Sequence, residues 1–240
     1  MKIITKLILV SIVFLSMNTL KSNELIQQNR TNKNEEITKP FTNIDIDGAF
    51  VVIIKQGEKE SFFIEADKKI MPYIKSSVKN NKLKIRLKTG LGSKEIKEIK
   101  LHITIKDLES LKLSGFINLE VPKQLNLLNL TLNFSGAVKG KLNSITKSLT
   151  CKTSSFSEIE LSGKTDKLKI NKNDASSVNA SKLKAETVKI KSAGFGTISV
   201  LAINKLNVTT SGAVKIAYAG NPTITKMDVK GFSTLKRLNK

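Results

Sequence analysis

The sequence predicts an all-β protein, a single-domain solenoid resembling a parallel β-helix with turns of about 19–20 residues. Three observations predict it. Short turns of small residues recur at a nearly constant interval. Apolar and polar residues alternate on both sides of each turn, which places one strand face inside and the other outside. Hydrophobic residues make up 40% of the chain but aromatic residues only 5%, so the core would be aliphatic.

The repeat begins near residue 106 and is the most informative feature of the chain. Its turns centre on residues 115, 136, 155, 175, 193, 212 and 231, in steps of 18 to 21. Leucine-rich repeats need an Asn-bearing consensus that is missing here, and propeller blades are about twice as long. One coil per repeat fits best, with equivalent strands stacked ~4.8 Å apart. Four glycines are then predicted at the same corner of successive coils: Gly115, Gly136, Gly194 and Gly212.

Residues 41–105 are also rich in strand patterns but are less regular than the repeats at 106–236. Residues 47–49 (Asp-Gly-Ala) resemble the later corners, so this part is predicted to form a modified first turn or cap. One short helix is expected between Asp67 and Val78, because Ile70, Ile74 and Val78 are spaced four apart and Pro72 stands early in the segment. The predicted solenoid domain spans residues 41–236.

The first 22 residues read as a secretory signal peptide. Lys2 and Lys6 precede a short apolar run over residues 7–15, too short for an ordinary membrane span. The cleavage site is weak, and a retained N-terminal anchor is the alternative. Residues 23–40 are polar and are expected to form a disordered lead-in. The mature chain is expected to have no transmembrane span and to lie in the periplasm or at the cell surface of a bacterium.

Few residues could carry chemistry, and we expect no catalytic, cofactor-binding or metal-binding residues and no cofactor. Cys151 is the only cysteine and is predicted to fill the core. His102 is the only histidine and is predicted to be exposed, on the strand face opposite Leu101 and Ile103. A single His and a single Cys exclude an ordinary zinc site. Asn171, Asn173 and Asp174 are the nearest approach to a calcium loop, but a corner explains them better.

Paired carboxylates keep one enzymatic alternative open, a polysaccharide-cleaving enzyme on a β-helix scaffold. Such an enzyme needs acids that converge on one face. Glu158 and Glu160 share a strand face, but a solvated face has the same pattern. The acids of the repeats are Glu158, Glu160, Asp166, Asp174, Glu186 and Asp228.

The chain is strongly basic, with 41 Lys and Arg against 20 Asp and Glu and a formal net charge of +21. Arginine occurs only at Arg30, Arg86 and Arg237. Specific nucleic-acid recognition relies on arginine for bidentate contacts, so no specific nucleic-acid partner is expected. Lysines spread through strands are also typical of a solvated face.

The segment from Phe41 to Gly57, the segment from Leu108 to Gly115 and the Ser-Gly-Ala corners resemble the putative auto-transporter adhesin head GIN domain family. The resemblance covers roughly residues 41–235. It implies a right-handed parallel β-helix-like fold outside the cytoplasm and brings no catalytic residues. The chain departs from the family pattern in its basicity and at Ser154-Ser155 and Asp174-Ala175, where glycine is common, so these two turns are the first places to look for irregular geometry.

These features predict an exported, non-enzymatic binding or adhesion-type domain. Its Lys-rich face would contact an anionic glycan, lipid head groups or an envelope polymer. The alternative is a structural or interaction scaffold in the periplasm. The sequence leaves the ligand and the oligomeric state open.

Overall fold

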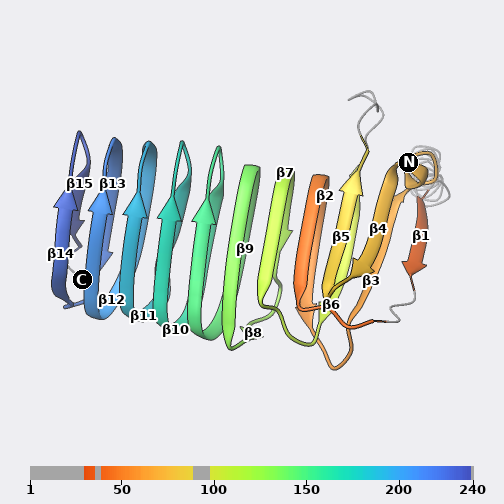
Figure 1. The fold of residues 1–240 in the computed structure, drawn as a ribbon, viewed down its shortest axis with the longest axis horizontal. Coiled ribbons are helices and arrows are strands. Elements are labelled where there is room, and N and C mark those ends of the chain that lie inside the picture. Colours follow the sequence, from red (N-terminus) through yellow and green to blue (C-terminus); the bar gives the residue numbers. More distant parts are fainter. Residues whose placement is uncertain (1–29, 36–38, 89–97, 239–240) are drawn as a thin grey trace, which may run out of the picture.

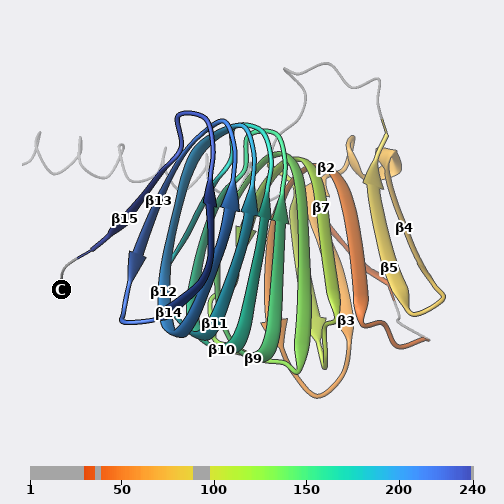
Figure 2. The ribbon, with the colours of Figure 1, turned by 60° about the vertical axis from the view of Figure 1, so that its left-hand side comes forward.

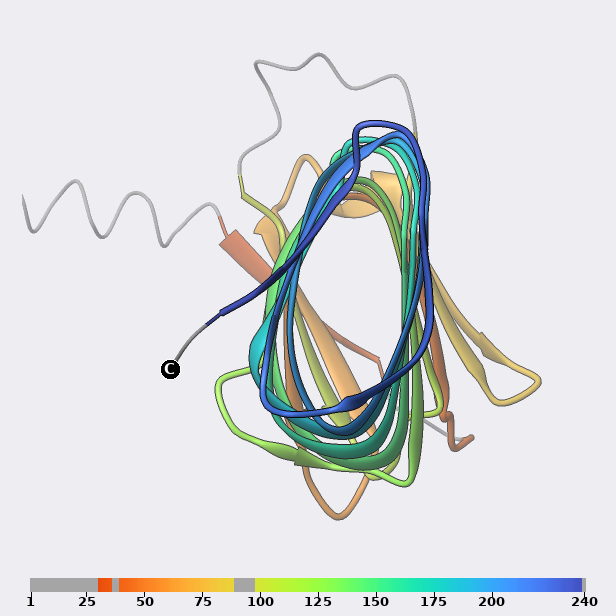
Figure 3. The ribbon, with the colours of Figure 1, turned by 90° about the vertical axis from the view of Figure 1, so that its left-hand side faces the viewer.

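The computed structural model describes residues 30–35, 39–88 and 98–238. The predicted signal peptide lies outside these residues. The strands form one long coil that rises turn by turn from the N-terminal to the C-terminal end (Figure 1). Seen along its axis, the coil is an elongated oval with two broad sides and two narrow edges (Figure 3). The predicted β-solenoid is confirmed.

The elements are almost all strands, several of which run around an edge of the coil. They are β1 (Arg30–Glu35), β2 (Asn43–Gln56), β3 (Ser61–Asp67), η1 (Met71–Tyr73), β4 (Ile74–Lys79), β5 (Lys82–Leu87), β6 (Lys100–Ile105), β7 (Ser110–Glu120), β8 (Leu125–Asn126), β9 (Asn129–Thr153), β10 (Glu158–Lys172), β11 (Ser177–Ser192), β12 (Phe195–Thr210), β13 (Ala213–Ala219), β14 (Thr223–Val229) and β15 (Thr234–Arg237).

Parallel pairing in register stacks the turns. β2 pairs with β7, β7 with β9, and the series continues through β10, β11 and β12 to β13 and β15, while β14 pairs with β12. Gly48 lies opposite Gly115, and Gly115 opposite Gly136. The Asp-Gly-Ala sequence at residues 47–49 is therefore the first copy of the repeating corner, as its resemblance to the later corners suggested.

The N-terminal end is covered by elements that leave the coil. β3 pairs antiparallel with β6, and β1 pairs antiparallel with β3. A β4–β5 hairpin is attached through β5 to the first half of β2 (Figure 2). These antiparallel additions end the parallel stack on this side.

Two local predictions are wrong. The helix expected over residues 67–78 is only a single 3-10 turn at Met71–Tyr73, and Ile74–Lys79 is a strand. Apolar residues four apart also fit a strand, because four is an even spacing and keeps Ile74 and Val78 on one face. The lead-in expected to be disordered forms β1 at Arg30–Glu35. An edge strand is held by backbone hydrogen bonds and needs no apolar sequence.

The core is a continuous stack of aliphatic side chains inside the oval. Alternation along β10 shows how it arises: Leu168 and Ile170 are buried, whereas Lys169 between them is exposed. The next turns supply Val188 and Ile190 at the same two positions. Each turn therefore buries its apolar face only against its neighbours, so stability depends on the stacking of whole turns.

The predicted turns of small residues form the corners along one narrow edge of the coil. Their loops lie side by side at the top of Figure 1. At this corner, the residue at the same position in each turn has a positive φ. These corner residues are Gly48, Gly115, Gly136, Ser155, Asp174, Gly194, Gly212 and Gly231. Two predicted centres, 175 and 193, are one residue away from the observed positions at 174 and 194, because residue counts alone do not fix where the backbone turns.

Ser155 and Asp174 adopt the left-handed conformation with φ values of 61° and 56°, so the two corners at which irregular geometry was considered keep the positive φ of the glycine corners. This conformation costs a residue with a Cβ atom about 1–2 kcal/mol. The Asp174 carboxylate compensates locally by accepting a hydrogen bond of 3.1 Å from the Ser155 backbone N–H.

Ser155→Gly is expected to raise the free energy of unfolding by about 0.5–1 kcal/mol, because relief of strain exceeds the entropy cost of glycine. Asp174→Gly relieves similar strain but removes the acceptor for Ser155 N–H, so its net effect is expected to be close to zero. Urea unfolding followed by circular dichroism measures both. A Ser155→Gly variant no more stable than Asp174→Gly would contradict this account.

Candidate functional site

The two residues with the strongest intrinsic reactivity do not form a site. Cys151 is fully buried in the core, where desolvation raises its pKa to about 12, so the prediction of a core role is confirmed. His102 does lie opposite the buried Leu101 and Ile103, but it is half-buried rather than exposed. β3 is the neighbouring strand of the same sheet, and its side chains lie beside the imidazole on that face. The imidazole stacks on Phe63 at a centroid distance of 4.2 Å, and its Nε2 lies 3.4 Å from Glu65 Oε2.

Most of the acids considered as catalytic candidates have partners of their own. Glu158 and Glu160 form ion pairs of 3.4 Å with Lys139 and Lys141 on the neighbouring turn, the arrangement of a solvated strand face. Asp228 pairs with Lys230 at 3.7 Å, and Glu186 accepts a hydrogen bond from Asn204. Asp166 is exposed on its own turn. Within residues 30–35, 39–88 and 98–238, His, Cys and acidic side chains form no group of three that could hold a metal ion.

The other broad side carries a more ordered polar arrangement, the Lys/Asn column. Its residues stand three positions before the corner residue on five successive turns, from the turn of Gly115 to that of Gly194: Lys112, Asn133, Lys152, Asn171 and Lys191. Cations and amides thus alternate turn by turn, about 4.8 Å apart. In the part of the chain that the structure describes, none of the three lysines has a carboxylate within ion-pair distance, in contrast to Lys139 and Lys141.

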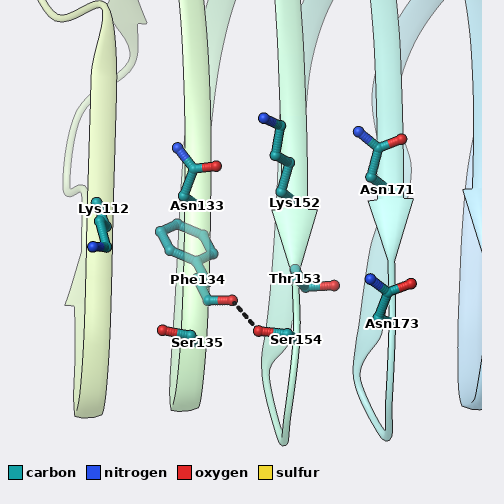
Figure 4. Close-up of a pocket in the computed structure, with 9 residues that line it drawn as sticks. All are labelled: Lys112, Asn133, Phe134, Ser135, Lys152, Thr153, Ser154, Asn171 and Asn173. Carbon is teal, nitrogen blue, oxygen red and sulfur yellow. Dashed lines mark hydrogen bonds between the residues drawn. The ribbon is translucent and has the colours of Figure 1, made fainter.

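A second polar column lies beside the first, one residue before each corner. It is the serine column, formed by Ser114, Ser135, Ser154 and Asn173. Figure 4 shows side chains of the two columns around a shallow surface hollow that crosses four turns. The Ser154 hydroxyl lies 3.5 Å from the Phe134 carbonyl oxygen. Amides, hydroxyls and unpaired ammonium groups can together bind hydroxyl-rich and anionic groups along the axis.

A buried polar layer supports the corners near this hollow. Lys172 is fully buried, and its ammonium donates hydrogen bonds to the backbone carbonyls of Asp174, Ala193 and Phe195. Burial lowers the pKa of Lys172, and the nearby negative charge of Asp174 partly opposes this effect. Thr153, on the preceding turn, hydrogen-bonds Ser176 at 2.9 Å. These contacts tie together loops from three successive turns.

Sequence reasoning missed a third column, one residue after each corner. Phenylalanine and alanine alternate along it without a break: Ala49, Phe116, Ala137, Phe156, Ala175, Phe195, Ala213 and Phe232. The four phenylalanines are between 66% and 90% exposed. The small-residue corners were visible in the sequence, but two were placed one residue away from their true positions, which hid the alternation.

Comparisons with known proteins agree with this fold. A putative adhesin from Bacteroides fragilis superposes with a TM-score of 0.80 at 22% identity, covering 87% of this chain and 97% of that one. A putative adhesin from Parabacteroides merdae gives a TM-score of 0.70 at 20% identity, with coverage of 88% and 97%. A putative lipid binding protein from Parabacteroides distasonis gives 0.66 at 22% identity, with coverage of 88% and 97%. At these identities the likeness shows the fold alone.

No curated protein sequence matches the chain. Among the described residues, no helix has the length and apolar character needed to cross a membrane. The family model described as "Putative auto-transporter adhesin, head GIN domain" matches residues 40–222, which is most of the chain. On that match, the chain belongs to the family of putative auto-transporter adhesin head GIN domains.

Proposed function

We propose that this protein is an exported, non-enzymatic binding module of the adhesion type, and that its Lys/Asn and serine columns bind an acidic glycan. The observation that carries the proposal is the row of Lys112, Lys152 and Lys191, which lack ion-pair partners in the described chain, whereas Lys139 and Lys141 on the opposite side are paired. Unpaired cations beside a hydrogen-bonding hollow favour an anionic, hydroxyl-rich ligand.

A non-enzymatic role is supported by the pairing of the candidate acids with lysines. Glycoside cleavage requires two carboxyl groups flanking one bond. Here Glu158 and Glu160 are each engaged by a lysine, and the Lys/Asn column contains no acid from Lys112 to Lys191. The long, shallow hollow also suits a polymer better than a small substrate, which is usually enclosed.

The expected result is salt-sensitive binding to an acidic polymer, tested with immobilised hyaluronan. The triple variant Lys112→Gln, Lys152→Gln, Lys191→Gln should lose about tenfold or more in affinity at low salt, since each exposed charge contributes up to ~1 kcal/mol. Binding of the unmodified protein should weaken as salt rises, because exposed charges are screened.

The matched control removes the same number of charges from the opposite broad side: Lys139→Gln, Lys141→Gln, Lys215→Gln. Its net charge equals that of the first variant, so if net charge alone decided binding, the two variants would lose the same affinity for the polymer. Equal losses of affinity, or no binding of the unmodified protein to the acidic polymer, would refute the proposed site.

One structural neighbour is described as a putative lipid binding protein. Vesicles containing phosphatidylglycerol therefore serve as the competing ligand in the same measurement.

A further inference from the structure

Over the five turns from Lys112 to Lys191, two surface columns of this solenoid repeat every second turn rather than every turn. Beyond these turns the Lys/Asn position is occupied by Asp45 at one end and by Thr209 and Asp228 at the other. Along the Lys/Asn column, lysine occupies the turns of Lys112, Lys152 and Lys191, and asparagine occupies those of Asn133 and Asn171. The third column, called the Phe/Ala column from here on, alternates in step with it. Each of these lysines stands four residues before an exposed phenylalanine, so lysine and phenylalanine fall on the same turns. Both columns therefore repeat at two strand spacings, about 9.6 Å.

The exposed phenylalanines do not pack on one another. Phe116, Phe156 and Phe195 lie on alternate turns, too far apart for ring contacts, which need centroid distances of about 4.5–7 Å. Among the described residues the stacked ring pair is Phe63 with His102, away from this column. Phenylalanines on every turn would be close enough to stack on one another. The alanines on alternate turns prevent this stacking, so packing within the protein does not explain the two-turn spacing.

A polymer lying along the axis explains both alternations. A sugar in an extended glycan advances the chain by roughly one strand spacing, so two turns correspond to one disaccharide. Lysine then meets an acidic sugar and asparagine meets the neutral sugar between two acidic ones. A phenylalanine face can stack on the apolar face of every second ring, as aromatic side chains do in binding sites. The serine column lies between them and supplies hydroxyl groups to the same chain.

We infer that the ligand is a linear acidic polysaccharide with one anionic group per disaccharide, bound lengthwise in phase with the two-turn repeat. This inference rests on the proposed function and specifies its ligand class. A lipid surface would use the exposed rings and lysines, but it has no fixed repeat and leaves the regular exchange of Lys for Asn and Phe for Ala without a cause.

The test compares two polymers by competition binding at equal chain length. Hyaluronan has a carboxylate on every second sugar, and polygalacturonate has one on every sugar. Simple charge attraction favours polygalacturonate, because its charge density is higher. The inference predicts the reverse order for the unmodified protein, with hyaluronan bound about tenfold more tightly or better.

The double variant Asn133→Lys, Asn171→Lys places a cation on every turn from Lys112 to Lys191. It should reverse the order, so that polygalacturonate is preferred. A control variant with the same added charge on the other side, Asn118→Lys and Asn179→Lys, should keep the original order. The variant Phe116→Ala, Phe156→Ala, Phe195→Ala should reduce hyaluronan affinity about tenfold, whereas Leu128→Ala at an exposed site away from the column should not.

The outcomes separate this inference from the proposed function. If both acidic polymers bind in the order of their charge density and the added lysines do not change that order, the two-turn match is wrong and the general anionic site survives. If neither polymer binds at low salt, both fail. If the phenylalanine variant loses binding to phosphatidylglycerol vesicles but not to hyaluronan, the Phe/Ala column is a membrane contact and the inference is overturned.

Discussion

Gly136→Val should destabilise the protein by at least about 3 kcal/mol. A Cβ atom at Gly136 would lie 2.5 Å from the backbone oxygen of Gly115, and the φ of Gly136 is +89°. The clash is therefore with the backbone of the neighbouring turn, which cannot rotate away as a side chain can. The conformation itself also disfavours a β-branched residue.

Chemical denaturation with two probes, circular dichroism and limited proteolysis, measures this loss. Gly140→Ala is the control, because Gly140 lies in the same turn without a positive φ and its added Cβ would meet only the Leu119 side chain, at 3.0 Å. We expect it to cost less than about 1.5 kcal/mol. Comparable losses for the two variants would show that backbone stacking at the corner is not what makes Gly136 necessary.

Lys172→Ala is expected to lower the free energy of unfolding by about 3 kcal/mol. The substitution leaves a cavity between turns and removes the donor for three carbonyl oxygens, each effect being substantial in a buried site. The nearby Gly196 shows how closely the lysine is enclosed, since a Cβ there would lie 3.3 Å from Lys172 Cε. Lys172→Met fills most of the volume without donating hydrogen bonds, so its loss should be smaller. Lys169→Ala, at an exposed position of the same strand, should change stability by less than about 0.5 kcal/mol.

The stability of the unmodified protein should also depend on pH through Lys172. Burial lowers the pKa of its ammonium below the usual value of 10.5, so the unfolded chain binds more protons than the folded one in the window between the two values. Stability therefore rises as pH increases through that window. Urea titrations at pH 7 to 10.5 should show that this rise is smaller in Lys172→Met. Equal pH dependence in both proteins would show that the lysine does not titrate with folding.

Much of the coil could be predicted because its determinants are local and repeated. Alternation in a segment such as Leu168–Lys169–Ile170 gives the inward face of a strand directly. The predictions that failed concerned segments whose structure depends on contacts with distant parts of the chain. The segment from Ile74 to Val78 fits a helix or a strand equally well until its pairing with β5 is known. His102 lies on the outward face as predicted, but only the structure shows that β3 pairs beside it and places Phe63 against the imidazole.

The candidate site was harder to predict because it depends on register between turns. Exposed lysines were visible in the sequence, but which of them share a column depends on turn lengths that vary by one or two residues. Lys172 is the clearest case. Strict alternation places it inward after Ile170, yet a lysine is normally read as exposed. The carbonyl groups that accept its hydrogen bonds come partly from the next turn, which strand patterning alone cannot reveal.

Because the surface columns alternate with a period of two turns, the number of coils by which such a chain can grow or shrink is restricted. Inserting or deleting a single coil would leave the core stacked but would bring two phenylalanine turns or two alanine turns together. A change of two coils preserves the alternation on both columns. If the surface is under selection, natural relatives should gain and lose coils in pairs, and the duplicated unit in their genes should encode a double coil, close in length to the interval from Phe116 to Phe156.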